Sequence, residues 1–188
     1  MNDFSGEVEN SLAVLKQGGA LLYPTDTVWG LGCDATNAEA VEKIYTIKDR
    51  PANKSMIVLM ADEKQVMQYV SQVDLAVFDY LQNTNRPTTV IYEGAVGLPQ
   101  NLLAADGSIG IRIVKDPFCR HLIKRSRKPL VSTSANISGQ PTPAIFSEIR
   151  PEILERVDYI VNYRREEAAP SAPSSIIRWQ NGGAVVLR

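Results

Sequence analysis

The sequence predicts one α/β domain that spans residues 1–188. The first observation behind this prediction is that helix-like and strand-like segments alternate over most of the chain. The second is that 188 residues, of which 44% are hydrophobic, suffice to bury one sizeable core. Three strand-like segments follow one another near the C-terminus, so some antiparallel pairing is expected there.

The N-terminal part predicts two amphipathic helices with a strand between them. The first helix ends at Gly18 and Gly19, and its apolar stripe consists of Val8, Leu12 and Leu15. Residues 20–23 form a short apolar strand that stops at Pro24. Asn37 is the predicted N-cap of the second helix, whose buried stripe consists of Val41, Ile44 and Tyr45. That helix should end before Pro51, because the residue preceding a proline is pushed out of the α region.

The remaining strands are predicted from short runs rich in apolar and β-branched residues. The runs are 56–60, 88–92, 109–114, 130–132, 159–161, 175–178 and 184–187. Two further helices are predicted to begin after Asp62 and Asp116, whose carboxylates can cap a first turn, and the second should reach about Arg127. The segment 164–173 is rich in charge, Ala and Pro, which favours a flexible loop.

The composition excludes several classes of protein. Lysine and arginine number 20 against 21 acidic residues, so any binding of polyanions must come from a local patch. The acidic start 1–4 does not resemble a signal peptide, and no apolar run approaches the roughly 18 residues that span a bilayer. Cys33 and Cys119 are far apart in sequence, which favours two buried reduced thiols. We therefore expect a cytoplasmic protein with no membrane partner.

The segment 23–32, Tyr-Pro-Thr-Asp-Thr-Val-Trp-Gly-Leu-Gly, follows the first strand with hydroxyls, a carboxylate and glycines. A turn that closes the strand and a loop that binds a ligand are about equally compatible with this composition. As a binding loop, it would present threonine hydroxyls and backbone amides to a ligand.

Three cations, Lys48, Arg50 and Lys54, cluster around Pro51 where the second helix is expected to end. Cations that complement the helix dipole are the simpler interpretation for any one of them. Three together favour a phosphate clamp, because arginine binds oxyanions bidentately and lysine supplies a point charge.

A buried strand also runs directly into the hydroxyl-rich segment 132–142, Ser-Thr-Ser-Ala-Asn-Ile-Ser-Gly-Gln-Pro-Thr. Its small side chains allow backbone N–H groups to approach a polyanion, and its oxygens can reach Mg²⁺ or the waters of the ion. A serine-rich cap and turn is equally compatible with this segment taken alone, and it lacks the glycine spacing of a Walker loop. Ser174, Ser175 and Arg188 are unremarkable by themselves.

No proton-shuttling constellation is visible. The single histidine, His121, lies in a predicted helix, and neither a Ser-His-Asp nor a Cys-His set is available. A site of cations, hydroxyls and an amide suits phosphoryl or nucleotidyl transfer, where positioning and charge stabilisation dominate. The basic run 120–128 is typical of a solvated helix end, and it is also the best place for a contact with RNA, if one exists.

Taken together, three motifs resemble the signature of the YrdC-like proteins. They are Tyr-Pro-Thr-Asp-Thr-x-Trp-Gly-Leu-Gly at 23–32, Lys-x-Arg at 48–50 and Ser-Thr-Ser-Ala-Asn at 132–136. The resemblance runs from about residue 7 to Arg188 and is to the short bacterial form. It implies the YrdC-like (DHBP synthase-like) fold, an open, twisted mixed sheet of parallel and antiparallel strands flanked by helices, with a concave, positively lined surface.

The resemblance also implies an activity. L-threonine, bicarbonate and ATP would give threonylcarbamoyl-adenylate and pyrophosphate, with Mg²⁺ as the cofactor of ATP. A tRNA threonylcarbamoyl-transferase complex would then use the adenylate to modify tRNA, and tRNA or double-stranded RNA could bind this chain directly. An N-carboxylated threonine must attack the α-phosphate, and a cationic cradle suits the crowded negative charges of that step.

Matched to the motifs by position, the resemblance implies two sets of contacts. The threonine contacts would be Thr27, Arg112, Ser132 and Ser174, with the guanidinium pairing the carboxylate. The nucleotide contacts would be Lys48, Arg50, Lys54, Ser134, Thr142 and Arg188. The catalytic set would be Lys48, Arg50, Ser134 and Asn136, and the asparagine would help to position Mg²⁺ indirectly.

Two departures from the family pattern affect this expectation. Residues 85–89, Asn-Arg-Pro-Thr-Thr, stand where relatives carry Trp-Pro-Gly-Pro-x-Thr, which puts the shape of that loop in doubt. Leu59 occupies a position that is polar in some relatives, so one threonine contact is expected to be lost.

Three alternatives remain open. An inactive paralogue of the YciO kind would be a nucleotide- or double-stranded RNA-binding module, but such relatives lack the Lys-x-Arg and Ser-x-Asn pairs present at 48–50 and 134–136. The carbamoyl-transfer enzymes of hydrogenase maturation share the fold in long chains with zinc-finger cysteines. A pure double-stranded RNA binder would bind with strong salt dependence and without nucleotide turnover.

Overall fold

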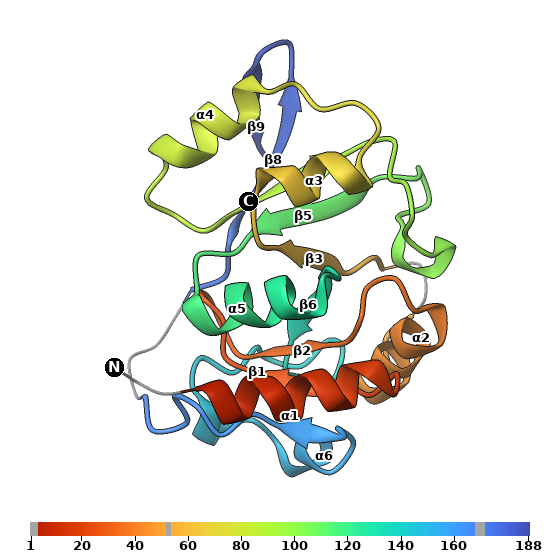
Figure 1. The fold of residues 1–188 in the computed structure, drawn as a ribbon, viewed down its shortest axis with the longest axis vertical. Helices are drawn as coiled ribbons and strands as arrows, with labels where there is room; N and C mark the ends of the chain where they lie inside the picture. Colours follow the sequence, from red (N-terminus) through yellow and green to blue (C-terminus); the bar gives the residue numbers. More distant parts are fainter. Residues whose placement is uncertain (1–3, 52–53, 168–171) are drawn as a thin grey trace.

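A computed structural model describes residues 4–51, 54–167 and 172–188. One mixed sheet runs through the molecule, in the order β7-β1-β2-β6-β3-β5-β4-β8-β9. The strands are β1 (Leu21–Tyr23), β2 (Gly30–Gly32), β3 (Ile57–Met60), β4 (Thr88–Tyr92), β5 (Ile109–Ile113), β6 (Leu130–Ser134), β7 (Tyr159–Ile160), β8 (Ser175–Gln180) and β9 (Gly183–Val186). Helices lie along both faces of this sheet, as the sequence predicts (Figure 1).

The helices divide between the two faces. They are α1 (Ser5–Lys16), α2 (Ala38–Ile47), α3 (Glu63–Tyr69), α4 (Ala76–Asn83), α5 (Pro117–Ser126) and α6 (Pro151–Leu154), with short 3₁₀ turns η1 (Gln100–Leu102) and η2 (Phe146–Glu148). Because side chains alternate along a strand, Leu21, Leu59 and Leu130 share one face and pack with α1 and α5. Leu22, Val58 and Val131 point to the other face and pack with α2, α3 and α4.

The predicted helix starts are confirmed, and the reason is local. Asn37 Oδ1 accepts from the N–H groups of Glu39 and Ala40, Asp62 Oδ1 from Gln65 N, and Asp116 Oδ1 from Cys119 N. Each carboxylate or amide satisfies N–H groups that have no partner inside the helix. α2 ends at Ile47, before Pro51, as expected.

The antiparallel pairing expected near the C-terminus is confirmed by β8 and β9, and antiparallel pairs also occur elsewhere in the sheet. β1 with β2, β2 with β6, β3 with β6, and β4 with β5 are all antiparallel, as is β8 with β9. The parallel pairs are β1 with β7, β3 with β5, and β4 with β8. One strand was not predicted: the last residues of the segment 23–32 form β2, which returns beside β1.

The two thiols behave as predicted, since Cys33 and Cys119 are buried and free. Burial raises the pKa of both thiols, so they are protonated at neutral pH. Among the described helices, none is both long and apolar enough to cross a membrane.

Candidate functional site

A cavity of about 350 Å³ lies on the sheet face that α1 and α5 share. Residues from β2, β3, β4, β5, β6 and β8 line it, together with the turn before β2 and the C-terminus of the chain. The predicted site residues among its lining are Thr27, Arg50, Arg112, Ser132, Ser134, Thr142, Ser174 and Arg188. All four predicted threonine contacts, far apart in the sequence, therefore meet in one cavity.

Register explains why the strands deliver polar side chains to this cavity. Ser132 pairs with Ile57, and Arg112 pairs with Leu59, so Ser132 and Arg112 point to the same face. Gly30 brings the β2 backbone close, since a Cβ there would lie 3.2 Å from Ser132 Oγ. A larger side chain at this position would fill the cavity.

The buried guanidinium of Arg112 is the most unusual group in the site. Its side chain is 3% exposed, and its Nη2 lies 3.1 Å from Asp26 Oδ1. The two atoms are not aligned as a hydrogen bond, and among the described residues neither Nε nor Nη2 of Arg112 has a hydrogen-bond partner. Asp26 therefore balances the charge of Arg112, while the donors stay available to a ligand carboxylate.

The turn before β2 is held by its own hydroxyls. Thr25 Oγ1 accepts from Thr27 N at 3.0 Å and donates to Val28 O at 2.8 Å, and it lies 3.0 Å from Thr27 Oγ1. On the opposite side, Ser174 Oγ lies 2.9 Å from Thr89 Oγ1 on β4. These contacts fix both Thr27 and Ser174 beside the cavity.

Two further arginines make the remainder of the cavity cationic. Arg50 is half-buried and donates from Nε to Lys54 O and from Nη2 to Ser55 O, at 3.0 and 2.8 Å. Arg188 donates from Nη2 to Ser174 O at 3.2 Å. Burial lowers the pKa of Arg50, but an arginine remains charged at any physiological pH.

Lys48, Lys54 and Asn136 are not among the residues that line this cavity. Lys48 is fully buried, and its ammonium donates to the carbonyls of Ser134 and Asn136. Lys54 contributes its carbonyl, which accepts from Arg50 Nε. The predicted cluster of three cations thus places only Arg50 at the cavity, and the direct roles of the two lysines stay predictions.

Asn136 holds the turn that follows β6. Its Nδ2 donates to Ile137 O at 3.0 Å and to Gln140 O at 2.7 Å, while its buried Oδ1 has no partner among the described residues. It lines a neighbouring cavity of about 240 Å³, which shares Thr142 with the first. No group of three or more His, Cys, Asp or Glu side chains within the described ranges could hold a metal ion.

Burial of Lys48 lowers its pKa to about 7 from the ordinary 10.5, and the charge of Arg50 acts in the same direction. Between these two values the unfolded chain holds the proton and the folded chain does not, so stability rises with pH. From pH 7 to pH 9, the free energy of unfolding should rise on the order of 2 kcal/mol more than in Lys48→Met. Urea denaturation of both proteins measures this, and equal pH dependence would contradict the shifted pKa.

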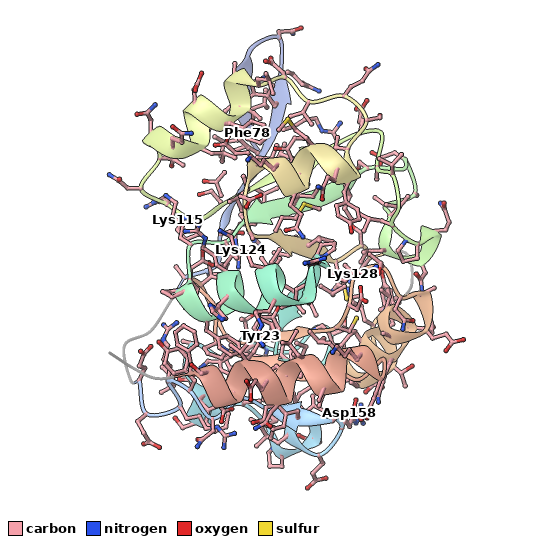
Figure 2. All side chains as sticks on the ribbon, in the orientation of Figure 1. Tyr23, Phe78, Lys115, Lys124, Lys128 and Asp158 are labelled. Atoms are coloured by element: carbon pink, nitrogen blue, oxygen red, sulfur yellow. The ribbon has the colours of Figure 1, made fainter. Side chains whose placement is uncertain are left out.

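Other sequence expectations fall away from the cavity. Leu59 pairs with Arg112 in the sheet and is fully buried in the core that packs with α5. Because its side chain is apolar, it offers no polar group to a ligand. His121 is exposed and its ring contacts Phe4. Most of the basic run 120–128 lies on α5: Lys124 is in the helix, and Lys128 comes just after its end (Figure 2). Of the predicted loop 164–173, residues 168–171 lie outside the described part.

Several lining residues were not predicted as part of the site, among them Ser55, Gly110, Thr133 and Pro173. Gly110 is needed because a Cβ there would lie 3.1 Å from Ile57 and 3.2 Å from Thr89. The interruption of an apolar strand by glycine at 110 was a signal available in the sequence. Thr133 belongs to the hydroxyl-rich segment 132–142 but was given no role of its own, and nothing in the local pattern distinguishes Ser55 from ordinary polar residues.

Comparisons with known proteins agree with this fold. The Sua5/YciO/YrdC family model, described as "Telomere recombination", matches residues 13–188. The chain is 33% identical over 175 residues to a threonylcarbamoyl-AMP synthase of Pseudoalteromonas translucida (strain TAC 125), with 92% of each chain covered. It is 34% identical over 171 residues to a putative threonylcarbamoyl-AMP synthase of Methanocaldococcus jannaschii, covering 91% of this chain and 79% of the relative.

Solved structures share the fold. P. abyssi Sua5 complexed with L-threonine matches with a TM-score of 0.84 at 22% identity, over 96% of this chain and 53% of that chain. This chain thus spans about half of the length of that Sua5. E. coli YciO matches with a TM-score of 0.81 at 25% identity, over 96% of this chain and 87% of that chain.

Proposed function

Because this chain belongs to the Sua5/YciO/YrdC family, we propose that it is a threonylcarbamoyl-AMP synthase that uses L-threonine, bicarbonate and ATP. The observation that carries the proposal is the buried guanidinium of Arg112 with unpaired donors, in a cavity that also contains Arg50 and Arg188. A carboxylate ligand suits the first arginine, and a polyphosphate suits the other two.

In the proposed reaction, bicarbonate and threonine form N-carboxythreonine with release of water. An oxygen of the new carboxylate then attacks the α-phosphorus of ATP, and the bond to the bridging oxygen of pyrophosphate breaks. Thr27, Ser132 and Ser174 would hold the polar groups of threonine, while Arg50, Ser134, Thr142 and Arg188 would hold the phosphates. The cations stabilise the charge that moves to pyrophosphate.

The expected Mg²⁺ would enter with ATP. Oxygen ligands of phosphate are what this ion prefers, and the described residues hold no carboxylate cluster for it. Asn136 Oδ1 is a ligand of the right type, but it is buried beneath the turn that its own Nδ2 closes. Its contribution to the ion would therefore be through the turn and not by direct contact.

Arg50→Ala is expected to lower the rate of adenylate formation about tenfold to a hundredfold, because a charge-assisted contact with phosphate is lost. Asn136→Ala should cause a comparable loss through the turn at 136–140, with the fold retained in both variants. Pyrophosphate release by each variant measures the effect. Arg120→Ala, which removes an exposed cation of α5 away from the cavity, is the matched control and should leave the rate unchanged.

The test of the function itself is pyrophosphate release from ATP and Mg²⁺, with threonine and bicarbonate supplied together and each omitted in turn. Release that requires both, with a product of the mass of threonylcarbamoyl-adenylate, is the expected result. ATP binding without turnover would overturn the synthase and favour the nucleotide- or RNA-binding module. The product would serve a tRNA threonylcarbamoyl-transferase complex in the cytoplasm. The exposed cations Lys124, Arg125, Arg127 and Lys128, in α5 and just after it, suit direct contact with tRNA.

A further inference from the structure

Arg164 follows β7 and has a backbone conformation that arginine rarely adopts. Its φ is +61°, in the left-handed region that favours glycine. Its guanidinium is 24% exposed and donates from Nη1 to Asp116 Oδ2 at 2.7 Å and to Thr25 O at 3.2 Å. Such a conformation persists only where surrounding contacts hold it, and here the side chain joins Thr25 to Asp116.

The partner carboxylate, Asp116, is more deeply buried than the arginine. Its side chain is 3% exposed, and its Oδ1 caps α5 by accepting from Cys119 N at 2.9 Å. Burial raises the pKa of Asp116, while the charge of Arg164 opposes the shift. Within the described ranges, Arg164 makes the only ion pair of this carboxylate, so it is the charged partner of the group that caps α5.

The two segments that Arg164 joins also meet beside the cavity. Cys119 Sγ donates to Pro24 O at 3.2 Å, and Lys115 N donates to Asp26 Oδ2 at 3.0 Å. The other oxygen of Asp26 is the one that faces Arg112. The turn 24–27 is therefore attached to the start of α5 at three points, and Arg164 supplies the one that includes an ion pair.

We propose that Arg164 is a positioning residue for the amino-acid end of the cavity. By joining Thr25 O to Asp116, it fixes the turn that places Thr27 in the cavity and Asp26 against Arg112. Arg164 and Thr27 also border the same small hollow, and Thr27 lines the main cavity as well. The inference rests on the proposed function, because it assigns this end of the cavity to threonine.

The test separates the side chain from the backbone. Arg164→Gly removes the guanidinium but keeps the left-handed conformation, which glycine adopts readily. We expect the KM and the Kd for threonine to rise about tenfold, with kcat changed less than about threefold and ATP affinity unchanged. Arg164→Lys, which retains a charge for Asp116, should restore part of the threonine affinity.

Glu167→Gln is the matched control, because Glu167 accepts from Arg164 Nε at 2.8 Å and, among the described residues, makes no hydrogen bond or ion pair with the turn. This variant should keep the wild-type KM for threonine. Unchanged threonine affinity in Arg164→Gly, or an equal loss in Glu167→Gln, would overturn the positioning role.

Hydrogen exchange tests the same role without threonine. The amides of Thr27 and Lys115, which donate to Thr25 Oγ1 and Asp26 Oδ2, should exchange about tenfold faster in Arg164→Gly than in the wild type. Equal exchange would overturn the proposal. A wild-type protein that binds no threonine would instead defeat the proposed function, and exchange at these two amides would still decide whether Arg164 holds the turn.

Discussion

Replacing Arg112 with methionine should lower kcat/KM for threonine by about a hundredfold to a thousandfold. The reason is that the guanidinium is buried, with Nε and Nη2 free of hydrogen bonds among the described residues, so a ligand carboxylate would pair with it out of water. A charge-assisted pair of this kind is far stronger than an exposed one. Steady-state pyrophosphate release with varied threonine measures the loss.

The same substitution leaves Asp26 without its charged partner, so loss of activity could reflect unfolding. An uncompensated buried charge costs about 3–5 kcal/mol. The double variant Asp26→Asn/Arg112→Met removes both charges and should recover most of this stability, but none of the threonine turnover. Activity in a folded double variant would mean that the substrate carboxylate binds elsewhere, and ATP affinity should stay near the wild-type value in both proteins.

Among the glycines in the strands, Gly32 is the one at which an added methyl group (Gly32→Ala) should destabilise the protein most. A Cβ at Gly32 would lie 2.0 Å from Val131 O and 2.8 Å from Tyr23 Cε1. The first contact is with backbone, so no side-chain rotation can relieve it, and β2 would have to move away from β6. The hydrogen bond from Tyr23 Oη to Val131 O, at 2.8 Å, lies at the same point. We expect a loss of about 3 kcal/mol or more in the free energy of unfolding.

Gly6→Ala is the matched control for this prediction. Gly6 lies in the first turn of α1, and a Cβ there would meet nothing within 4 Å. Alanine favours a helix over glycine, so this variant should be stabilised by about 0.5–1 kcal/mol. Urea denaturation of the two variants beside the wild type measures both effects. Equal stability of the two alanine variants would mean that β2 and β6 do not approach as closely as described.

Helix starts and apolar strands were predictable because their causes are local. Asn37, Asp62 and Asp116 each satisfy N–H groups two or three residues away, so a single position suffices to find the start of a helix. α4 was not predicted, since its N-cap position is Leu75, which has no capping side chain. The signal lay one residue earlier, where Asp74 Oδ1 accepts from Ala76 N at 3.0 Å.

β2 could not be found in the same way. Its three residues include two glycines, which strands usually avoid, and the local pattern resembles a turn. The glycines are there because Val131 O and Ser132 Oγ approach the strand, and those atoms come from a strand about 100 residues later in the sequence. Only the packed sheet supplies that reason.

The sequence alone determined the α/β class and the main helix starts, because these depend on hydrophobic period and on short-range hydrogen bonds. The residues predicted to contact threonine and nucleotide came from the resemblance to the YrdC-like family, and those roles stay predictions. The tertiary structure decided which of the predicted groups reach the cavity: Arg50 and Arg112 do, whereas Lys48 is turned inward to two carbonyls. It also joined Arg164 to Thr25 and Asp116. Those arrangements depend on strand register and on contacts between distant segments, which no local pattern of residues encodes.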